Sequence, residues 1–234
     1  MNSIVRCFIV LLGLVMSTPL WALAPDMKVA SHVVQIRGIH PDGRSYFGSG
    51  VAVSKDRVAT NCHVVRSGGR VAVFRGGEAY KVTRQQVDIV HDVCVLEVPG
   101  LPVKAAPLES IQHLKVGQAL AFYGYPRALG LSFSEGKLRR IKAMAGIQII
   151  ETSTFFTLGG SGGGLFDRQG RLVGLATFLA PGHAGGYFAV PVDWVKSVEK
   201  APYQAIEPLQ GLSFWEAKEA DSSLISGPEG AHKH

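Results

Sequence analysis

The run Gly159-Gly160-Ser161-Gly162-Gly163-Gly164-Leu165-Phe166 decides between two fold classes. It fits the Gly-x-Ser-x-Gly pattern of α/β-hydrolases, in which a strand, a sharp turn and a helix follow one another. Here the serine is followed by more glycines, a short apolar run and the turn signal Asp167-Arg168-Gln169-Gly170. An α/β-hydrolase also needs an acid and a histidine farther along the chain, and the histidines available there are His183, His232 and His234. The context therefore favours a β-hairpin after the serine over an α/β-hydrolase.

Short apolar runs of alternating polarity lie on both sides of this serine. Alternation at a period of two is typical of strands that are buried on one face. The runs lie at residues 33–37, 50–53, 70–74, 92–98, 119–123, 147–151, 171–177 and 186–190. We therefore predict an all-β protein in two halves, joined by the stretch 99–117. A short helix is expected at 191–198, and a poorly ordered tail from residue 201 apart from an apolar patch at 209–215.

The composition excludes several classes of protein. Of the 234 residues, 47% are hydrophobic and 18% are charged, whereas disordered chains combine low hydrophobicity with high charge. The net charge of +6 is scattered and forms no stripe of basic and aromatic residues, so we expect no nucleic-acid partner. The terminal His232 and His234 make no metal site, and we expect no metal and no cofactor.

The N-terminus has the three parts of a secretory signal peptide. One positive charge within residues 1–6 precedes the apolar run 7–16 and the small-residue exit 17–22. Cleavage after Ala22 is expected; cleavage after Ala24 fits the Ala-x-Ala pattern better but would leave Pro25 next to the cut. The alternative is an uncleaved anchor. We predict a periplasmic or secreted protein without stable membrane insertion after removal of the signal, since no later segment is long and apolar enough to span a bilayer.

Two further stretches carry residues that can activate a serine. His63 ends the apolar stretch 58–63, and Asp92 directly precedes the strand pattern 93–98. A serine hydroxyl is a weak nucleophile that needs a base within about 2.6–3.2 Å. His63 can accept its proton, and Asp92, preferred here over Asp88, can orient the imidazole. The chain order His63, Asp92, Ser161 is that of chymotrypsin-type triads; a core histidine and a turn-capping aspartate are the structural alternatives.

At this point the sequence resembles a known family. The motifs at residues 48–53, 60–65, 92–96, 159–166 and 186–191 look like those of a trypsin-like serine protease, of the compact bacterial type related to the HtrA/Deg protease domain. The resemblance covers about residues 31–200. It implies two six-stranded antiparallel β-barrels with the active site between them.

The resemblance also implies an organisation of the chain. We expect a signal peptide at 1–22, an N-terminal barrel at 23–105 with His63 and Asp92, a C-terminal barrel at 106–200 with Ser161, and a tail at 201–234. That tail is too short for the PDZ domain of HtrA proteins, so none is expected. The backbone amides of Gly159 and Ser161 would form the oxyanion hole, at about 3–4 kcal/mol per donor.

The sequence departs from digestive trypsins at two positions. Gly160, just before the serine, stands where those enzymes carry the acid that pairs with a new N-terminus, so we predict no zymogen cleavage beyond signal removal. Phe155, six residues before the serine, stands where trypsin carries the aspartate that selects Lys or Arg. We predict a specificity pocket formed by Phe155, Phe156 and Tyr187 and cleavage after apolar side chains.

Removal of the signal peptide removes Cys7 and leaves Cys62 and Cys94. In the implied fold their segments meet, because His63 and Asp92 contact each other. A disulfide here would contribute about 3–4 kcal/mol in the chain-entropy model. Two buried free thiols that pack as small apolar groups are the alternative.

The functional prediction is an exported serine endopeptidase that acts on protein or peptide substrates through an acyl-enzyme. A protease-like scaffold that binds without cutting is the alternative from another class, and an esterase would share the mechanism. The sequence leaves the natural substrate and the oligomeric state open.

Overall fold

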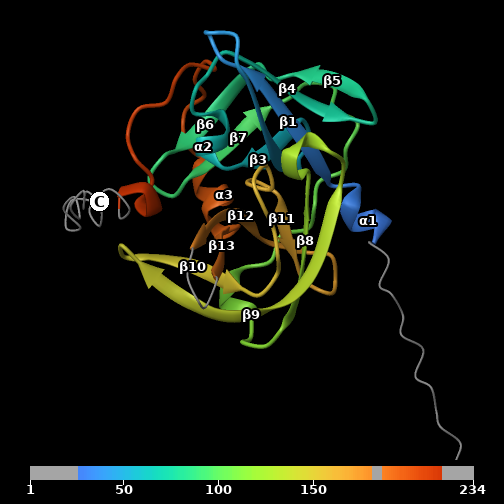
Figure 1. Ribbon diagram of the computed structural model, residues 1–234, viewed down its shortest axis with the longest axis vertical. Helices are drawn as coiled ribbons and strands as arrows, with labels where there is room; N and C mark the ends of the chain where they lie inside the picture. The colour runs from blue at the N-terminus through green and yellow to red at the C-terminus, as the bar shows by residue number, and fades with distance from the viewer. Residues whose placement is uncertain (1–25, 181–185, 218–234) are drawn as a thin grey trace, which may run out of the picture.

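The computed structural model describes residues 26–180 and 186–217. The predicted signal peptide at 1–22 and His183, His232 and His234 lie outside the described residues. Figure 1 shows two β-structured halves, one above the other, with the C-terminal segment returning alongside the upper half. Within the described residues, no helix has the length and hydropathy needed to cross a membrane.

The N-terminal half is a seven-stranded antiparallel sheet with the strand order β5-β4-β1-β2-β3-β7-β6. Its strands are β1 (Val33–Ile39), β2 (Ser45–Ser54), β3 (Arg57–Thr60), β4 (Arg70–Arg75), β5 (Glu78–Lys81), β6 (Arg84–Asp88) and β7 (Val93–Glu97). The valine-rich β7 is buried almost throughout, because β3 and β6 flank it on both edges. This central position places the start of β7 inside the molecule.

The C-terminal half is a closed six-stranded barrel with the order β10-β13-β12-β11-β8-β9. Its strands are β8 (Ala119–Gly124), β9 (Ser132–Met144), β10 (Ile147–Thr152), β11 (Gly164–Phe166), β12 (Leu172–Ala180) and β13 (Gly186–Pro191). β11 and β12 form the hairpin expected after Ser161. The turn between them contains Gly170 at φ 72°, a conformation that glycine adopts without steric cost.

The helices are short. Those that lie wholly within the described residues are α1 (Met27–Ala30), α2 (Cys62–Val65), α3 (Asp193–Val198) and the 3₁₀ turns η1 (Ile111–His113) and η2 (Pro126–Ala128), and a further helical turn starts at residue 214. α3 lies within the stretch 191–198 for which the sequence predicted a helix. It follows β13 and packs against β7 of the N-terminal sheet.

The all-β class and one closed six-stranded barrel are confirmed, but the expectation of six strands in the N-terminal half is wrong. The chain from Arg70 to Lys81 turns back on itself as the hairpin β4–β5, through Gly76 and Gly77 at positive φ. Neither glycine would meet an obstacle at an added Cβ, so the turn is exposed. The hairpin adds a seventh strand at the edge of the sheet, and β5 and β6 form the two edges of the described sheet.

One apolar core connects the two halves. It contains Val33, Val51 and Val93 of the first sheet together with Phe166 and Leu175 of the barrel. Fully burying such a side chain contributes about 1.5–3 kcal/mol. Packing between the halves therefore fixes their relative position, and with it the loops at their junction.

The prediction of a poorly ordered tail from residue 201 is wrong for residues 201–208, and the apolar patch at 209–215, which that prediction excepted, is also held in place. Gln204 exchanges both backbone hydrogen bonds with Gln85 of β6, at 2.8 and 2.9 Å. Farther along, the Leu209 amide donates to the Arg66 carbonyl and the Phe214 amide to the Val90 carbonyl. Backbone hydrogen bonds to the N-terminal sheet hold this segment, which composition does not reveal.

Candidate active site

His63 and Asp92 lie next to two neighbouring strands of the N-terminal sheet, β3 and β7. His63 lies in α2, just after β3, and Asp92 lies in the turn before β7. The Asp92 carboxylate accepts two hydrogen bonds from His63: Oδ1 from the backbone amide at 2.9 Å and Oδ2 from Nδ1 at 2.7 Å. The Asp92 side chain is fully buried, whereas that of His63 is 22% exposed. The buried carboxylate therefore fixes an imidazole whose other edge reaches the surface.

The backbone at Asp92 has an unusual conformation. Its φ of 57° lies in the left-handed region, which aspartate tolerates better than most residues. The turn is stabilised by the Asp92 amide, which donates to the Ile89 carbonyl, and by the Cys62 amide, which donates to the Asp92 carbonyl. This turn directs the carboxylate back toward α2.

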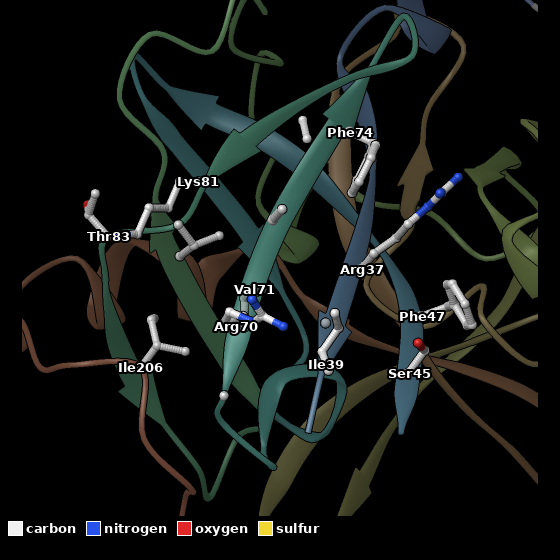
Figure 2. A pocket seen from close by; sticks show the side chains of 15 residues that line it. Arg37, Ile39, Ser45, Phe47, Arg70, Val71, Phe74, Lys81, Thr83 and Ile206 are labelled. Atoms are coloured by element: carbon white, nitrogen blue, oxygen red, sulfur yellow. The ribbon is translucent and has the colours of Figure 1, made fainter. Parts of the chain in front are cut away.

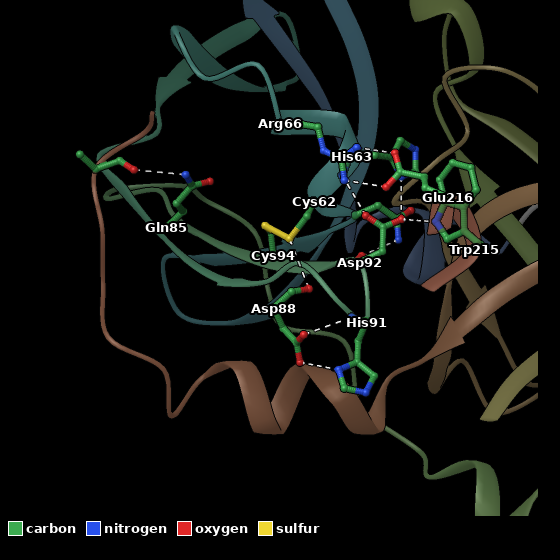
Figure 3. The surroundings of a disulfide bond; sticks show 12 residues. Cys62, His63, Arg66, Gln85, Asp88, His91, Asp92, Cys94, Trp215 and Glu216 are labelled. Carbon is green, nitrogen blue, oxygen red and sulfur yellow. Dashed lines mark hydrogen bonds and ion pairs between the residues drawn. A yellow bond between two sulfur atoms is a disulfide. The ribbon is translucent and has the colours of Figure 1, made fainter. Parts of the chain in front are cut away.

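Cys62 and Cys94 are joined by a disulfide, which was one of the two outcomes left open from the sequence. Their Cα atoms lie 4.9 Å apart, since Thr60 pairs with Cys94 across the β3–β7 ladder. Figure 3 shows the bond beside the contact between His63 and Asp92. The covalent bond therefore joins the two segments that carry His63 and Asp92.

Asp88, the other candidate acid in the sequence, is hydrogen-bonded to a different histidine. Its carboxylate contacts His91 Nδ1 at 2.7 Å, and the His91 ring stacks on Trp194 with 3.4 Å between centroids. This cluster packs against α3 (Figure 3). Asp92 is thus the acid that contacts His63.

Ser161 lies in the glycine-rich loop between β10 and β11. Its hydroxyl donates to the Thr177 carbonyl at 3.3 Å, and the hydrogen bonds of the described residues include none between Ser161 and His63. Gly162 adopts φ 78°, and a Cβ there would lie 2.2 Å from the Ser49 carbonyl oxygen and 2.3 Å from Thr60 Oγ1. Glycine is therefore required where the serine loop meets the N-terminal sheet.

Ser49 binds the serine loop from β2. Its amide donates to the Ser161 carbonyl at 2.9 Å and its hydroxyl to the Gly159 carbonyl at 2.9 Å. The same hydroxyl accepts from the Tyr125 amide at 2.8 Å. The sequence analysis placed Ser49 in a motif but assigned it no role.

Asn61 joins the two loops and was missed from the sequence. Its side-chain amide donates to the Asp92 carbonyl at 3.0 Å and to Thr177 Oγ1 at 3.1 Å, and its oxygen accepts from the Gly162 amide at 2.7 Å. The side chain is buried. Its position directly before Cys62 and His63 is the one signal that could have identified it. Through Asn61, the Asp92 turn and the residue after Ser161 share one hydrogen-bonded bridge.

The amides of the predicted oxyanion hole are available. Gly159 adopts φ 83°, and neither its amide nor that of Ser161 donates to another group within the described part of the chain. The Gly160 amide instead closes a turn on the Thr157 carbonyl at 2.8 Å.

The three predicted pocket residues occupy different environments. Phe156 is buried in the barrel core, with its ring 5.4 Å from that of Phe122. Phe155 is 57% exposed, and its ring lies 5.5 Å from that of Tyr187. Phe155 and Tyr187 are thus the members of the predicted set that reach the surface.

Trp215 is a second neighbour of the site that the sequence analysis did not assign. Its indole nitrogen donates to Asp92 Oδ2 at 3.0 Å, and its ring meets that of His63 edge-on, with 5.5 Å between centroids. The indole comes from the C-terminal segment, more than a hundred residues from its partners in the chain.

A cavity of about 720 Å³ lies away from these residues, on the N-terminal sheet. Figure 2 shows Arg37, Ile39, Phe47 and Phe74 around it, with Lys81 and Ile206 on the opposite side. None of His63, Asp92 and Ser161 lines it. Within the described residues, no group of three or more His, Cys, Asp or Glu side chains is placed to hold a metal ion.

The fold has two β-structured halves. A histidine–aspartate pair lies in the first half, and hydrogen bonds through Asn61 connect it to a glycine-rich loop of the second half that carries a serine. This combination defines the chymotrypsin-like class. The model of the trypsin-like peptidase domain family matches residues 48–175, which is more than half of the chain. This chain therefore belongs to the trypsin-like peptidase family.

Among curated proteins, a probable periplasmic DegP-like serine endoprotease of Halomonas elongata is 31% identical over 163 residues, which are 66% of this chain and 34% of that protein. The serine protease Rv3671c of Mycobacterium tuberculosis is 31% identical over 156 residues, 61% of this chain and 39% of the relative. This chain thus spans little more than a third of the length of these relatives.

Solved structures support the same fold. The active form of the Rv3671c protease superposes with a TM-score of 0.70 at 25% identity, covering 80% of this chain and 87% of the other. The HtrA-type protease AlgW with a tripeptide has a TM-score of 0.68 at 23% identity, covering 74% and 60%. The second likeness concerns the fold alone.

Proposed function

We propose that this protein is an exported serine endopeptidase in which Ser161, His63 and Asp92 form the catalytic triad. The observation that carries the proposal is the paired hydrogen bonding of His63 to buried Asp92, at 2.9 and 2.7 Å. The bridge through Asn61 links this pair to the Ser161 loop. Membership in the trypsin-like peptidase family supports the reaction class.

In this proposal the Ser161 hydroxyl attacks the carbonyl carbon of the scissile bond while His63 Nε2 takes its proton. Protonated His63 then donates that proton to the leaving amine, and an acyl-enzyme remains that water hydrolyses by the same steps. The hydroxyl donates to Thr177 in the free protein, so it must rotate toward His63 when substrate binds. Catalytic hydrogen bonds commonly tighten only in the substrate complex.

The amides of Gly159 and Ser161 would hold the oxygen of the tetrahedral intermediate. Their lack of other partners among the described residues supports this role. Each such donor typically changes kcat by about 10²–10³-fold. The Ser49 hydroxyl bond to the Gly159 carbonyl restrains the conformation of the loop at that residue.

Protein or peptide substrates are proposed, with cleavage after apolar residues. The exposed aromatic pair Phe155 and Tyr187 supports this preference, as does the phenylalanine at position 155, where trypsin carries the aspartate that selects Lys or Arg. A peptide-library cleavage profile tests it: enrichment of apolar residues before the cut is expected, and a profile dominated by Arg or Lys would overturn it.

The proposal of export rests on the N-terminal pattern and on the Halomonas relative, which is named a probable periplasmic protein. We propose domain boundaries of 23–105 and 106–200 for the two halves. N-terminal sequencing of the protein recovered outside the cytoplasm tests the cleavage. The recovered protein should begin at residue 23, and retention of residues 1–22 would contradict a cleaved signal.

A fluorophosphonate probe tests the reaction class directly. It should label the wild-type protein at Ser161 and leave the Ser161→Ala variant unlabelled, and His63→Ala should slow labelling strongly because the general base is lost. Absence of labelling in a folded wild-type protein would overturn the proposal and support the non-catalytic scaffold.

A further inference from the structure

The C-terminal segment reaches the candidate active site. We use the name C-terminal strap for residues 204–216, which run from the edge of β6 to the Asp92 turn. Backbone bonds from Gln204, Leu209 and Phe214 hold the strap along its length to three parts of the N-terminal half: to β6, to the residue after α2, and to the turn between β6 and β7. The last of these, from the Phe214 amide to the Val90 carbonyl at 3.0 Å, ends two residues before Asp92.

Trp215 completes the hydrogen bonding of the Asp92 carboxylate. Oδ2 accepts from His63 Nδ1 at 2.7 Å and from the Trp215 indole at 3.0 Å, while Oδ1 accepts from the His63 amide. Three donors fix a carboxylate more firmly than two, since each restricts rotation about its side-chain bonds. Figure 3 shows the indole approaching Asp92 from the side opposite the disulfide.

Aromatic packing holds the indole in this orientation. The Trp215 ring stacks on Phe178 of β12 with 5.4 Å between centroids and an interplanar angle of 14°. Phe178 in turn stacks on Phe188 of β13 at 4.9 Å. Trp215 thus touches the barrel with its face, His63 with a T-shaped contact and Asp92 with its nitrogen.

An ion pair anchors the strap beside Trp215. The Glu216 carboxylate makes a two-pronged contact with the Arg66 guanidinium, in which Nη2 donates to Oε2 at 2.6 Å. The same carboxylate accepts from the Ser213 amide at 2.9 Å and from its hydroxyl at 2.6 Å. A serine followed three residues later by a bonded glutamate is a capping arrangement that starts a helical turn, and here the turn begins at Phe214.

We propose that Trp215 is a positioning residue of the catalytic triad, delivered by the C-terminal strap, and that it holds the Asp92 carboxylate and the His63 imidazole in their productive orientation. This inference rests on the proposed function, because it assigns Trp215 to the same reaction. The indole touches no reacting atom. It acts through Asp92, because the indole N–H and the His63 Nδ1 both bond to the negatively charged Oδ2 of that residue.

Trp215→Phe is the main test, because it removes the indole N–H and keeps an aromatic ring. We expect kcat for a peptide substrate to fall about tenfold, the factor of one hydrogen bond to a charged group, with little change in KM. The acidic midpoint of the kcat/KM pH profile should rise, since the carboxylate then directs more of its charge at protonated imidazole. Trp194→Phe is the matched control and should keep the wild-type rate and profile.

Equal rates and pH profiles for wild type and Trp215→Phe would overturn the inference. A lower rate with an unchanged acidic midpoint of the pH profile would also overturn the inference, because a residue with a structural role alone gives that result. A wild-type protein that neither cleaves nor labels would instead overturn the proposed function, which separates the two failures.

A readout that needs no activity tests the contact itself. The mature protein that begins at residue 23 keeps two tryptophans, Trp194 and Trp215. After labelling with ¹⁵N-tryptophan, their two indole signals can be assigned by single Trp→Phe substitutions. We expect the Trp215 N–H to be protected from hydrogen exchange and to shift in the Asp92→Asn variant, with the Trp194 signal unchanged. A freely exchanging Trp215 signal that ignores Asp92→Asn would contradict the contact.

Discussion

Gly162 shows how one residue determines the relative position of the two loops of the site. Its positive φ and its close approach to Ser49 and Thr60 leave no room for a side chain. The amide of the same residue donates to Asn61. A change at this position therefore alters both the conformation of the serine loop and its attachment to the N-terminal sheet.

Gly162→Ala should destabilise the protein and abolish fluorophosphonate labelling, because the new Cβ meets the Ser49 carbonyl oxygen at 2.2 Å. Gly100→Ala is the matched control: φ there is 76°, but no atom lies within 4 Å of the added Cβ. It should cost about 1–2 kcal/mol for the left-handed backbone alone and leave labelling intact. Chemical denaturation and probe labelling measure both effects, and similar losses in the two variants would contradict the steric argument.

Asn61→Ala removes three hydrogen bonds and leaves the Gly162 amide with the Ala176 carbonyl as its remaining acceptor. We expect a loss of about 1–3 kcal/mol in the free energy of unfolding and a slower labelling of Ser161. The exposed Gln112→Ala serves as a control in urea denaturation. Wild-type labelling by Asn61→Ala would show that the bridge between the loops is dispensable.

At the scale of elements, the disulfide joins the start of α2 to β7. It closes a loop with a sequence separation of 32, for which chain entropy gives a contribution of about 3–4 kcal/mol. The double variant Cys62→Ser, Cys94→Ser should lose stability on that scale and lose its sensitivity to reductant. Denaturation midpoints of both proteins, with and without dithiothreitol, measure this; a reductant-insensitive wild type would contradict it.

The sequence predicted the elements whose signals are local. Alternating polarity located strands in both halves. His63, Asp92 and Ser161 were each identified from one short stretch of sequence around them. The hairpin β4–β5 was missed because β5 (Glu78–Lys81) is polar and gives no alternating apolar pattern. Pairing with β4 holds β5 in place, and the local sequence does not show this pairing. Asn61 and Trp215 were missed for a related reason: their roles arise from contacts between distant segments, and neither residue type signals such a contact by itself.

At the scale of the whole molecule, the C-terminal strap depends on the charge of Glu216. Burial acts to raise the pKa of this carboxyl, but hydrogen bonds from Arg66 and Ser213 prevail and hold the pKa below its ordinary value of 4.5. A depressed pKa means that the folded state favours the charged form. The stabilisation is therefore complete above about pH 4.5 and is lost as the pH falls through the lower pKa of the folded protein.

Glu216→Gln should reduce the free energy of unfolding at pH 7 by about 1–2 kcal/mol. The difference from wild type should shrink below about pH 4.5, because the wild-type carboxyl then becomes protonated. Glu207→Gln, in an exposed position of the same strap, is the control and should match wild type throughout. Urea unfolding between pH 3 and pH 7 measures the three proteins, and a difference that grows toward low pH would contradict the ion-pair anchor.

The docking of the C-terminal strap on the N-terminal half has a consequence for biosynthesis. A ribosome makes Trp215 after every other residue described at the site, and the strap can dock only once it has left the exit tunnel or the export channel. A partly synthesised chain can already contain Ser161 and His63, while the indole that we propose to position Asp92 is still missing. In the proposed mechanism, such a chain would cleave its neighbours more slowly than the protein with the strap in place.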